Sequence, residues 1–156
     1  MRKYWFLATC SLIVLATMSA CDDKTTPEQE IRALVREAQI AAEERQVGDL
    51  ARLISEQYGD ERGNNKDELV RMLRLQMIRN QVIYLMVRTG EITLLDDMSA
   101  KAVVRVAMAG GPLETYEDLA RLGAELYRFD LELVKESGKW RIISARWGRA
   151  LDLDFA

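Results

Sequence analysis

The sequence predicts an α+β domain in which N-terminal helices pack on one face of a curved, mostly antiparallel β-sheet. Between residues 26 and 80 the apolar residues recur at helical spacing, and from residue 82 onward they alternate with polar residues as in strands. Ser137-Gly138 is a two-residue connection typical of a β-hairpin. Helices first and hairpin-linked strands later are the pattern of a fold with its helices on one side of the sheet.

The first helix is expected to begin at Pro27. Thr26 and Gln29 form a capping-box pattern around this position, and proline suits it because the first helical N–H has no intrahelical partner. Gly48 is the expected C-terminal cap, and a short second helix is expected over 50–54.

A third helix is expected after a polar, glycine-containing loop. Asn65 can cap this helix, and Glu68 three residues later completes a second capping-box pattern. Met72 and Leu75 widen the apolar stripe beyond one face. This predicts that neighbours contact the third helix on more than one side.

Four segments have strand periodicity: 82–95, 101–108, 126–134 and 139–147. A bulge or turn is expected near Thr89-Gly90, and 114–122 is expected to be a short helix or an ordered loop. The last segment is apolar on both faces, which predicts a central strand covered on two sides. Trp140 and Trp147 lie seven residues apart in it, so we expect them on opposite faces.

Residues 1–20 have the layout of a bacterial secretory signal. Arg2 and Lys3 precede an uncharged apolar run, and two small residues stand before Cys21. The run of about 15 residues is shorter than the ~20 that a membrane-spanning helix needs. We therefore expect a cleaved signal peptide and not a stop-transfer anchor.

Met18-Ser19-Ala20-Cys21 resembles a lipobox, the cleavage site of bacterial lipoproteins, although Met18 stands where leucine is usual. The resemblance implies that Cys21 becomes the mature N-terminus, with a diacylglycerol on its sulfur and usually a third acyl chain, such as palmitate, on its amine. Two or three acyl chains hold a protein on a bilayer for long times. The alternative is ordinary cleavage that leaves Cys21 as a free thiol.

Asp22 and Asp23 bear on which membrane holds the protein. An aspartate directly after the lipidated cysteine resembles the inner-membrane retention signal of enteric bacteria. We therefore expect a cell-envelope lipoprotein that faces the periplasm from the inner membrane, with the outer membrane as the alternative. Residues 21–25 are then the lipidated cysteine and a short polar tether.

The composition excludes several kinds of chemistry. The chain has no histidine, which removes the commonest general base and the commonest metal ligand. Cys10 leaves with the signal peptide and Cys21 is expected to be acylated, so no thiol remains for disulfide or zinc chemistry. The net charge of −3 gives no electrostatic reason to bind nucleic acid. The segment 60–65 lacks the ligand spacing of a calcium loop. We therefore expect no metal, and we also expect no cofactor.

The order of elements resembles the nuclear-transport-factor-like superfamily, which includes ketosteroid isomerases and SnoaL-type polyketide cyclases. The resemblance is carried by the first two helices, the loop after them and the final hairpin: 31–42, 49–54, Tyr58-Gly59-Asp60, 127–133 and Gly138-Lys139-Trp140-Arg141-Ile142. It covers residues 26–150 and leaves 151–156 as a C-terminal tail. It implies a cystatin-like cone with one open end, and often a homodimer through the convex face of the sheet.

Enzymes of this superfamily often use an Asp or His base with tyrosine or acid partners inside the cone. The resemblance makes six residues candidates for such a role: Tyr58, Asp60, Tyr127, Tyr84, Tyr116 and Asp130. Two of the acids also have an ordinary structural explanation. Asp60 lies in a glycine-flanked loop, where turn formation is the usual role, and Asp130 lies on the charged face of its strand.

We therefore expect a membrane-anchored envelope lipoprotein that is not an enzyme and binds a partner protein or a small apolar ligand through its cone or sheet face. The alternative is an acid–base enzyme of the cone fold, an isomerase or cyclase, and the third reading is a dimeric scaffold. A buried, unpaired carboxylate beside a tyrosine would indicate the enzyme. A cone filled by apolar side chains would indicate the binding or structural role.

Overall fold

The computed structural model of the protein describes residues 25–80 and 83–150. The expected signal peptide, the residues Cys21, Asp22 and Asp23 for which lipidation and sorting are expected, and the tail 151–156 lie outside the described residues. Within the two described ranges, every helix is too short or too polar to cross a bilayer.

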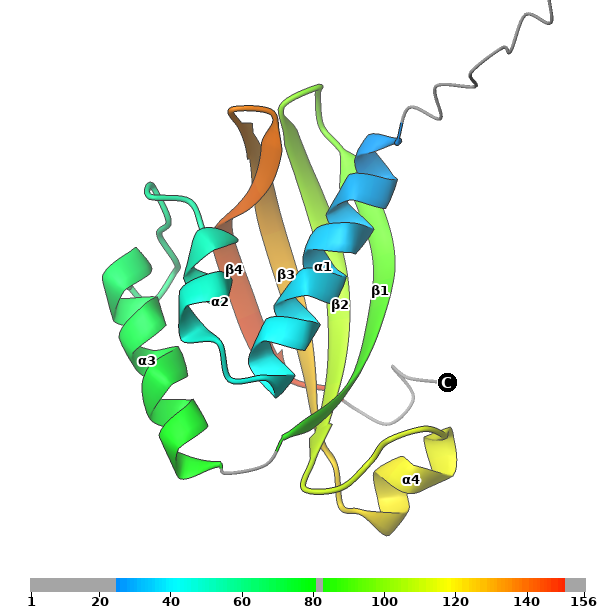
Figure 1. Ribbon diagram of the computed structural model, residues 1–156. Helices are drawn as coiled ribbons and strands as arrows, with labels where there is room; N and C mark the ends of the chain where they lie inside the picture. The colour runs from blue at the N-terminus through cyan, green and yellow to red at the C-terminus, as the bar shows by residue number, and fades with distance from the viewer. Residues whose placement is uncertain (1–24, 81–82, 151–156) are drawn as a thin grey trace, which may run out of the picture.

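Three helices precede a four-stranded sheet, and a short fourth helix interrupts the strands (Figure 1). The helices are α1 (Pro27–Glu43), α2 (Val47–Arg52), α3 (Lys66–Arg79) and α4 (Tyr116–Arg121). The strands are β1 (Tyr84–Leu94), β2 (Ser99–Ala109), β3 (Glu125–Glu136) and β4 (Lys139–Arg149). They pair antiparallel in chain order, β1-β2-β3-β4. The predicted α+β class is confirmed.

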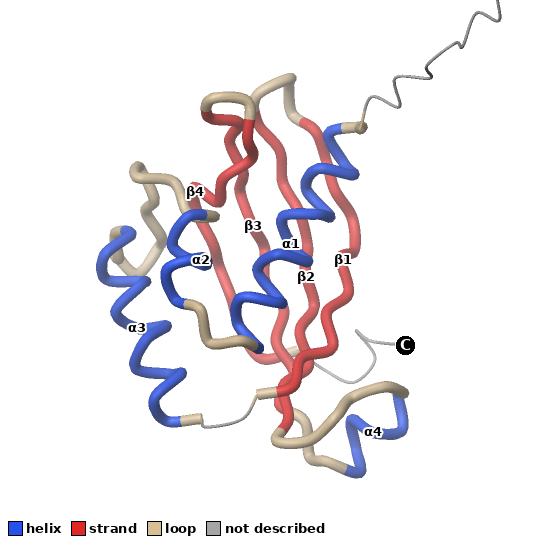
Figure 2. Tube along the Cα trace, viewed as in Figure 1, coloured by secondary structure: helices blue, strands red, loops and turns tan. Residues whose placement is uncertain are grey.

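The sheet is curved, and α1 lies across one of its faces, which we call the inner face (Figure 2). Both long helices begin where the capping patterns place them. The Gln29 backbone N–H donates to Oγ1 of Thr26 at 3.3 Å, and the Glu68 N–H donates to Oδ1 of Asn65 at 3.0 Å. These bonds satisfy helical N–H groups that have no other partner, which fixes the first turn of each helix.

The prediction for the end of the first helix is wrong. α1 ends at Glu43, and Gly48 lies inside α2 instead of capping α1. Arg45 takes the left-handed conformation, with φ of 61°, that a glycine usually supplies. Its side chain donates a 2.5 Å hydrogen bond to the carbonyl oxygen of Met77 in α3, so a tertiary contact holds it there.

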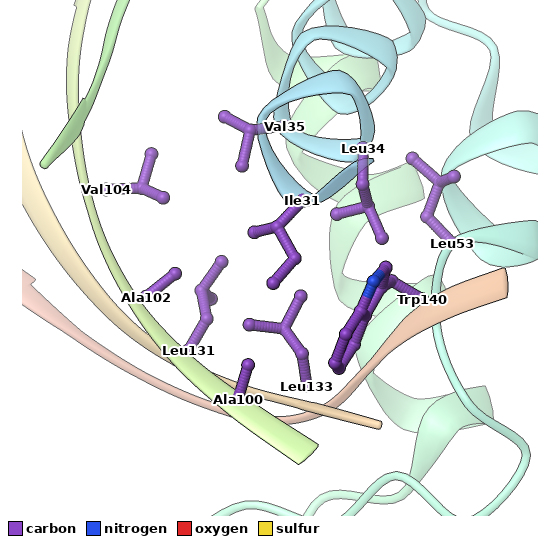
Figure 3. Close-up of a cluster of buried hydrophobic side chains, with 10 residues drawn as sticks. All are labelled: Ile31, Leu34, Val35, Leu53, Ala100, Ala102, Val104, Leu131, Leu133 and Trp140. Atoms are coloured by element: carbon purple, nitrogen blue, oxygen red, sulfur yellow. The ribbon is translucent and has the colours of Figure 1, made fainter. Parts of the chain in front are cut away.

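The core lies between α1 and the inner face of the sheet (Figure 3). It consists of ten buried side chains from α1, the residue after α2, and strands β2, β3 and β4: Ile31, Leu34, Val35, Leu53, Ala100, Ala102, Val104, Leu131, Leu133 and Trp140. Ile31 is fully buried and projects from α1 toward the sheet. The space between α1 and these strands is therefore filled by apolar side chains.

The last strand differs from its prediction in two ways. β4 is an edge strand and not a central one. Glu132 pairs with Ser144 and Leu133 with Ile142, so Ile143 is the extra residue of a β-bulge. The bulge shifts the alternation by one residue, and Trp140 and Trp147 therefore lie on the same, inner face and not on opposite faces.

The edge of β4 is covered by the chain that follows α2. Ile142 donates its N–H to the carbonyl of Leu53 at 2.9 Å and accepts from the N–H of Ser55 at 2.9 Å. Gly59 donates to the carbonyl of Ile143 at 3.0 Å. This lateral cover, and not a second layer of structure on its outer side, accounts for apolar residues such as Ile143 in an edge strand.

The other sheet edge is bonded by side chains of α1. Gln39 donates to the carbonyl of Leu85 at 3.1 Å, and Glu43 accepts from the N–H of Leu85 at 2.9 Å. Arg32 donates to the carbonyl of Thr89 at 3.1 Å. α1 therefore covers the inner face and also occupies hydrogen-bonding groups of β1.

The third helix is less covered than its sequence predicts. Only Met77 is buried, and it packs with Leu50 of α2 and Ala41 of α1. The other apolar side chains that widened the stripe are exposed, with relative exposures of 37% for Met72 and 51% for Leu75. The prediction of contacts on more than one side of this helix is therefore wrong.

The face of the sheet opposite α1, which we call the outer face, is covered at one end by α4. Leu119 of α4 packs on Ala107 of β2 and Leu126 of β3. Of the short helix or ordered loop expected over 114–122, the structure has the helix. The expected irregularity near Gly90 is also confirmed, because the β1–β2 register shifts there.

Candidate functional site

Tyr58 and Asp60, two of the candidate catalytic residues, are in contact. The buried Tyr58 hydroxyl donates to Oδ2 of Asp60 at 3.3 Å. Asp60 also accepts from the backbone N–H groups of Arg62 and Asn64, both at 2.9 Å, and from the Asn64 side chain at 2.9 Å. The carboxylate thus organises its own loop, as aspartates in turns commonly do.

The pKa of Asp60 is lowered. Burial opposes the ionised form, but the hydrogen bonds from Asn64, Arg62 and Tyr58 outweigh it. The pKa of Tyr58 is raised, first by burial and then by the charge of Asp60. A general base is expected to have a carboxylate pKa shifted upward, so these directions favour a structural role for the pair.

Tyr127 lies elsewhere, on the inner face of β3. Its hydroxyl donates to Oε2 of Glu125 at 3.1 Å, and the guanidinium of Arg149 lies 5.7 Å from the centre of its ring. Burial and then the contact with Glu125 raise the pKa of Tyr127. In the described part of the chain, no hydrogen bond or ring contact joins Tyr127 to Tyr58 or Asp60.

The three remaining candidates are spread over the surface. Asp130 lies on the outer face, where it accepts from Arg128 at 2.9 Å and from Arg146 at 3.3 Å. Burial opposes ionisation of Asp130, but these two guanidinium groups lower its pKa. Tyr84 and Tyr116 are exposed. The six candidates therefore form one pair and four separate positions.

Sequence reasoning missed a row of aromatic rings on the inner face. The rings of Tyr127 and Phe129 are 6.5 Å apart, and those of Phe129 and Trp147 are 6.4 Å apart. Arg62 covers the Trp147 ring at 4.5 Å. The bulge at Ile143 brings Trp147 to this face, and a seven-residue spacing alone does not reveal it.

An open groove of about 1020 Å³ lies between α1, α2 and the β3–β4 hairpin. Apolar side chains form much of its lining, with Leu34 from α1, Leu53 after α2 and Trp140 from β4. Ile40 of α1 also lines it and is 53% exposed. Thr25, the first described residue, lies at the same groove, so the chain enters the domain there.

The rim of this groove carries charges of both signs. Lys66 donates to Oε1 of Glu56 at 2.6 Å and to the carbonyl of Ile54 at 2.9 Å. Lys135 donates to Glu30 at 2.7 Å, and this contact is the main reason why the pKa of Glu30 is lowered. Most of the rim is thus electrostatically balanced.

The acidic side chains do not form a metal site in the described part of the chain. No group of three or more acidic side chains within 25–80 and 83–150 is arranged to hold a metal ion. In the segment 60–65, the oxygens of Asp60 are directed to donors of its own loop.

Comparison with known proteins identifies the fold. The sequence matches no family model and no curated protein. An NTF2-like protein of unknown function from Shewanella oneidensis MR-1 is 18% identical, with a TM-score of 0.61 over 78% of this chain and 98% of that one. A cystatin-like protein from Caulobacter vibrioides is 17% identical, with a TM-score of 0.63 over 80% and 89%. The protein has an NTF2-like fold.

Some of the similar structures carry a description of activity. A proposed dehydratase of the NTF2-like family from Streptomyces avermitilis is 14% identical, with a TM-score of 0.63 over 81% of this chain and 99% of that one. Identity at this level shows the NTF2-like fold alone. The cystatin-like cone that the sequence resemblance implied is therefore confirmed as a fold, and the activity has to be argued from the site.

Proposed function

We propose that the protein is a lipid-anchored component of a bacterial envelope whose NTF2-like domain binds a segment of a partner protein and is not catalytic. The segment occupies the groove between α1, α2 and the β3–β4 hairpin. The observation that carries this proposal is the position of the groove beside Thr25. Thr25 stands four positions after Cys21, so an extended tether of about 14 Å would hold the groove close to the bilayer surface.

The shape of the groove favours a peptide segment over a small ligand. Small-molecule sites have volumes of about 300–1,000 Å³ and enclose most of their ligand. This groove is at the upper end of that range and is not enclosed. An exposed apolar side chain such as Ile40, flanked by paired charges, is suited to a partner segment with apolar anchors and a polar rim.

The state of the acidic candidates supports a role without catalysis. Asp60 is bonded to four donors of its own loop, and Asp130 is bonded to Arg128 and Arg146. The space beneath α1 is filled by the apolar core. An acid–base enzyme would need a carboxylate that is free to exchange a proton with a substrate.

Photo-crosslinking in the natural host tests the groove. A photoreactive amino acid replaces Ile40 in the groove or, as a matched control, Ile78, which is exposed on α3. We expect crosslinks to a specific envelope protein from position 40 and not from position 78. They should weaken strongly when Cys21→Ser removes the anchor. Equal labelling from both positions, or recovery of a small molecule and no protein, would contradict the proposal.

The anchor and its location have tests of their own. Intact-mass analysis of the protein from its host should show acyl chains on Cys21, and an unmodified cysteine would contradict lipid anchoring. We further propose that Asp22 retains the protein in the inner membrane. Density-gradient fractionation should then show Asp22→Ser moving to the outer membrane. Wild-type protein in the outer-membrane fraction would exclude this role of Asp22.

A homodimer through the sheet, which the family resemblance implied, stays a prediction. The outer face that would carry it is crossed by charged side chains, among them Arg105, Arg128 and Asp130. A face of this kind associates less readily than an apolar one, because its charges lose water on contact. Sedimentation velocity of the purified protein measures the oligomeric state directly.

A further inference from the structure

Three arginines cross the middle of the outer face on neighbouring strands. Arg88 of β1 pairs with Arg105 of β2, and Arg105 pairs with Arg128 of β3. The side chains of directly paired residues lie on the same face, with Cβ atoms about 5 Å apart. Like charges in such positions repel one another, so an anion nearby stabilises a row of this kind.

The carboxylate of Asp130 lies beside Arg128, at one end of the row. Arg128 donates to Oδ1 of Asp130 through Nε at 3.0 Å and through Nη2 at 2.9 Å. Arg146 donates to the other oxygen, Oδ2, at 3.3 Å. Asp130 is thus shared by two guanidinium groups and does not bond the central one.

Arg105, at the centre of the row, has a side-chain donor without an acceptor. Its Nε is buried and has no hydrogen-bond partner, and its guanidinium forms no ion pair within the part of the chain that the structure describes. A buried donor without an acceptor is costly, and more so on a charged group. An anion bound at this guanidinium would compensate its charge.

The fold holds this guanidinium in a defined place. A Cβ atom added at Gly90 would lie 2.8 Å from Nη1 of Arg105 and 3.3 Å from the carbonyl oxygen of Val103. The guanidinium therefore lies against β1 where Gly90, next to the register shift, leaves room for it. A guanidinium fixed in position is suited to bind a planar oxyanion through two hydrogen bonds.

We propose that Arg105 is a carboxylate-binding site on the outer face of the sheet. A carboxylate is favoured over phosphate, because the neighbouring Asp130 repels a dianion more strongly than a monoanion. The acid has two possible sources. It belongs to another molecule, or it belongs to this chain, whose sequence after Ala150 contains Asp152 and Asp154. Ala150 packs against the outer-face cluster two residues along β2 from Arg105.

Titration of the purified full chain with the peptide acetyl-Asp-Leu-Asp-amide tests this site. NMR follows the Arg105 Nε–H signal, and the dissociation constant is compared between wild type and Arg105→Gln. If the acid comes from outside, wild type binds the peptide and Arg105→Gln weakens binding about tenfold or more. Arg74→Gln, the same charge change on the exposed face of α3, should leave the affinity unchanged.

A double variant distinguishes the two sources. If Asp152 and Asp154 already occupy the site, wild type will not bind the peptide and Asp152→Asn with Asp154→Asn will bind it through Arg105. Gly90→Ala displaces the guanidinium without removing its charge. It should weaken peptide binding in whichever of the two proteins, wild type or the double variant, binds the peptide. The proposal is overturned if neither wild type nor the double variant binds the peptide, or if the binding does not depend on Arg105 and Gly90.

Discussion

The indole N–H of Trp140 donates a 2.9 Å hydrogen bond to Oε2 of Glu30, which joins the last strand to the first helix across 110 residues. Lys135 donates to the same oxygen at 2.7 Å. Glu30→Ala leaves the buried indole without an acceptor, so we expect the free energy of unfolding to fall by about 1–3 kcal/mol. Urea denaturation measures it. Glu28→Ala, in the same helical turn, should cost less than about 0.5 kcal/mol.

The stabilisation by Glu30 should depend on pH. Its pKa is lowered in the folded state from 4.5, first by the hydrogen bond from Lys135. A carboxyl with a lowered folded pKa contributes stability that is fully present above its unfolded pKa and is lost as pH falls through the folded one. The stability difference between wild type and Glu30→Gln should therefore be constant near neutral pH and shrink below pH 4.5. A difference that grows on acidification would contradict this assignment.

Asp60 should matter for stability and not for partner binding. Asp60→Ala removes the acceptor for two backbone N–H groups and for the Tyr58 hydroxyl, so we expect a loss of about 1–3 kcal/mol. Crosslinking from position 40 should be unchanged at temperatures where the variant is folded. Loss of binding in a fully folded Asp60→Ala protein would mean that this loop belongs to the functional site.

The bulge at Ile143 can be tested by deletion. Removing Ile143 makes Leu133–Ile142 and Glu132–Ser144 consecutive pairs, so Trp147 stays on the inner face, whereas removing Ala145 moves Trp147 to the outer face. We expect the deletion of Ile143 to cost about 1–3 kcal/mol, because Gly59 loses the carbonyl of Ile143 as its acceptor. The deletion of Ala145 should cost more than about 3 kcal/mol or abolish the cooperative unfolding transition. Comparable stabilities for the two deletion variants would show that the bulge does not set the register.

The two sides of α3 should respond differently to substitution. Ile78 is 65% exposed, so Ile78→Lys should change the free energy of unfolding by less than about 0.5 kcal/mol. Met77 is buried against α1 and α2, so Met77→Ala should cost about 2–4 kcal/mol. Thermal and urea unfolding of both variants provide the comparison, and a large loss in Ile78→Lys would indicate an undescribed contact on that side.

Local signals predicted the start of each long helix and the final hairpin. Thr26 and Asn65 act through side-chain hydrogen bonds within three residues, and such bonds can be read from a short stretch of sequence. The end of α1 was missed because Arg45 adopts a left-handed conformation and its side chain bonds to Met77, 32 residues away. Local propensity does not reveal a contact over that distance.

The candidate sites were harder to predict than the fold. The contact of Tyr58 with Asp60 follows from their closeness in the chain, but the hydrogen bonds that lower the acid's pKa depend on the loop conformation. The aromatic row depends on one unpaired residue in β4. The arginine row depends on the register between strands, and no spacing in the sequence indicates which arginines become neighbours.

The occupied edges of the sheet have a consequence for a protein concentrated on a membrane. The proposed anchoring would confine molecules to two dimensions, where exposed strand edges on neighbouring copies would meet often and join into fibrils. Here backbone groups of Leu53, Ser55 and Gly59 bond along β4, and side chains of α1 bond to Leu85 and Thr89 of β1. High surface density is therefore compatible with separate molecules, and recruitment by strand addition is disfavoured.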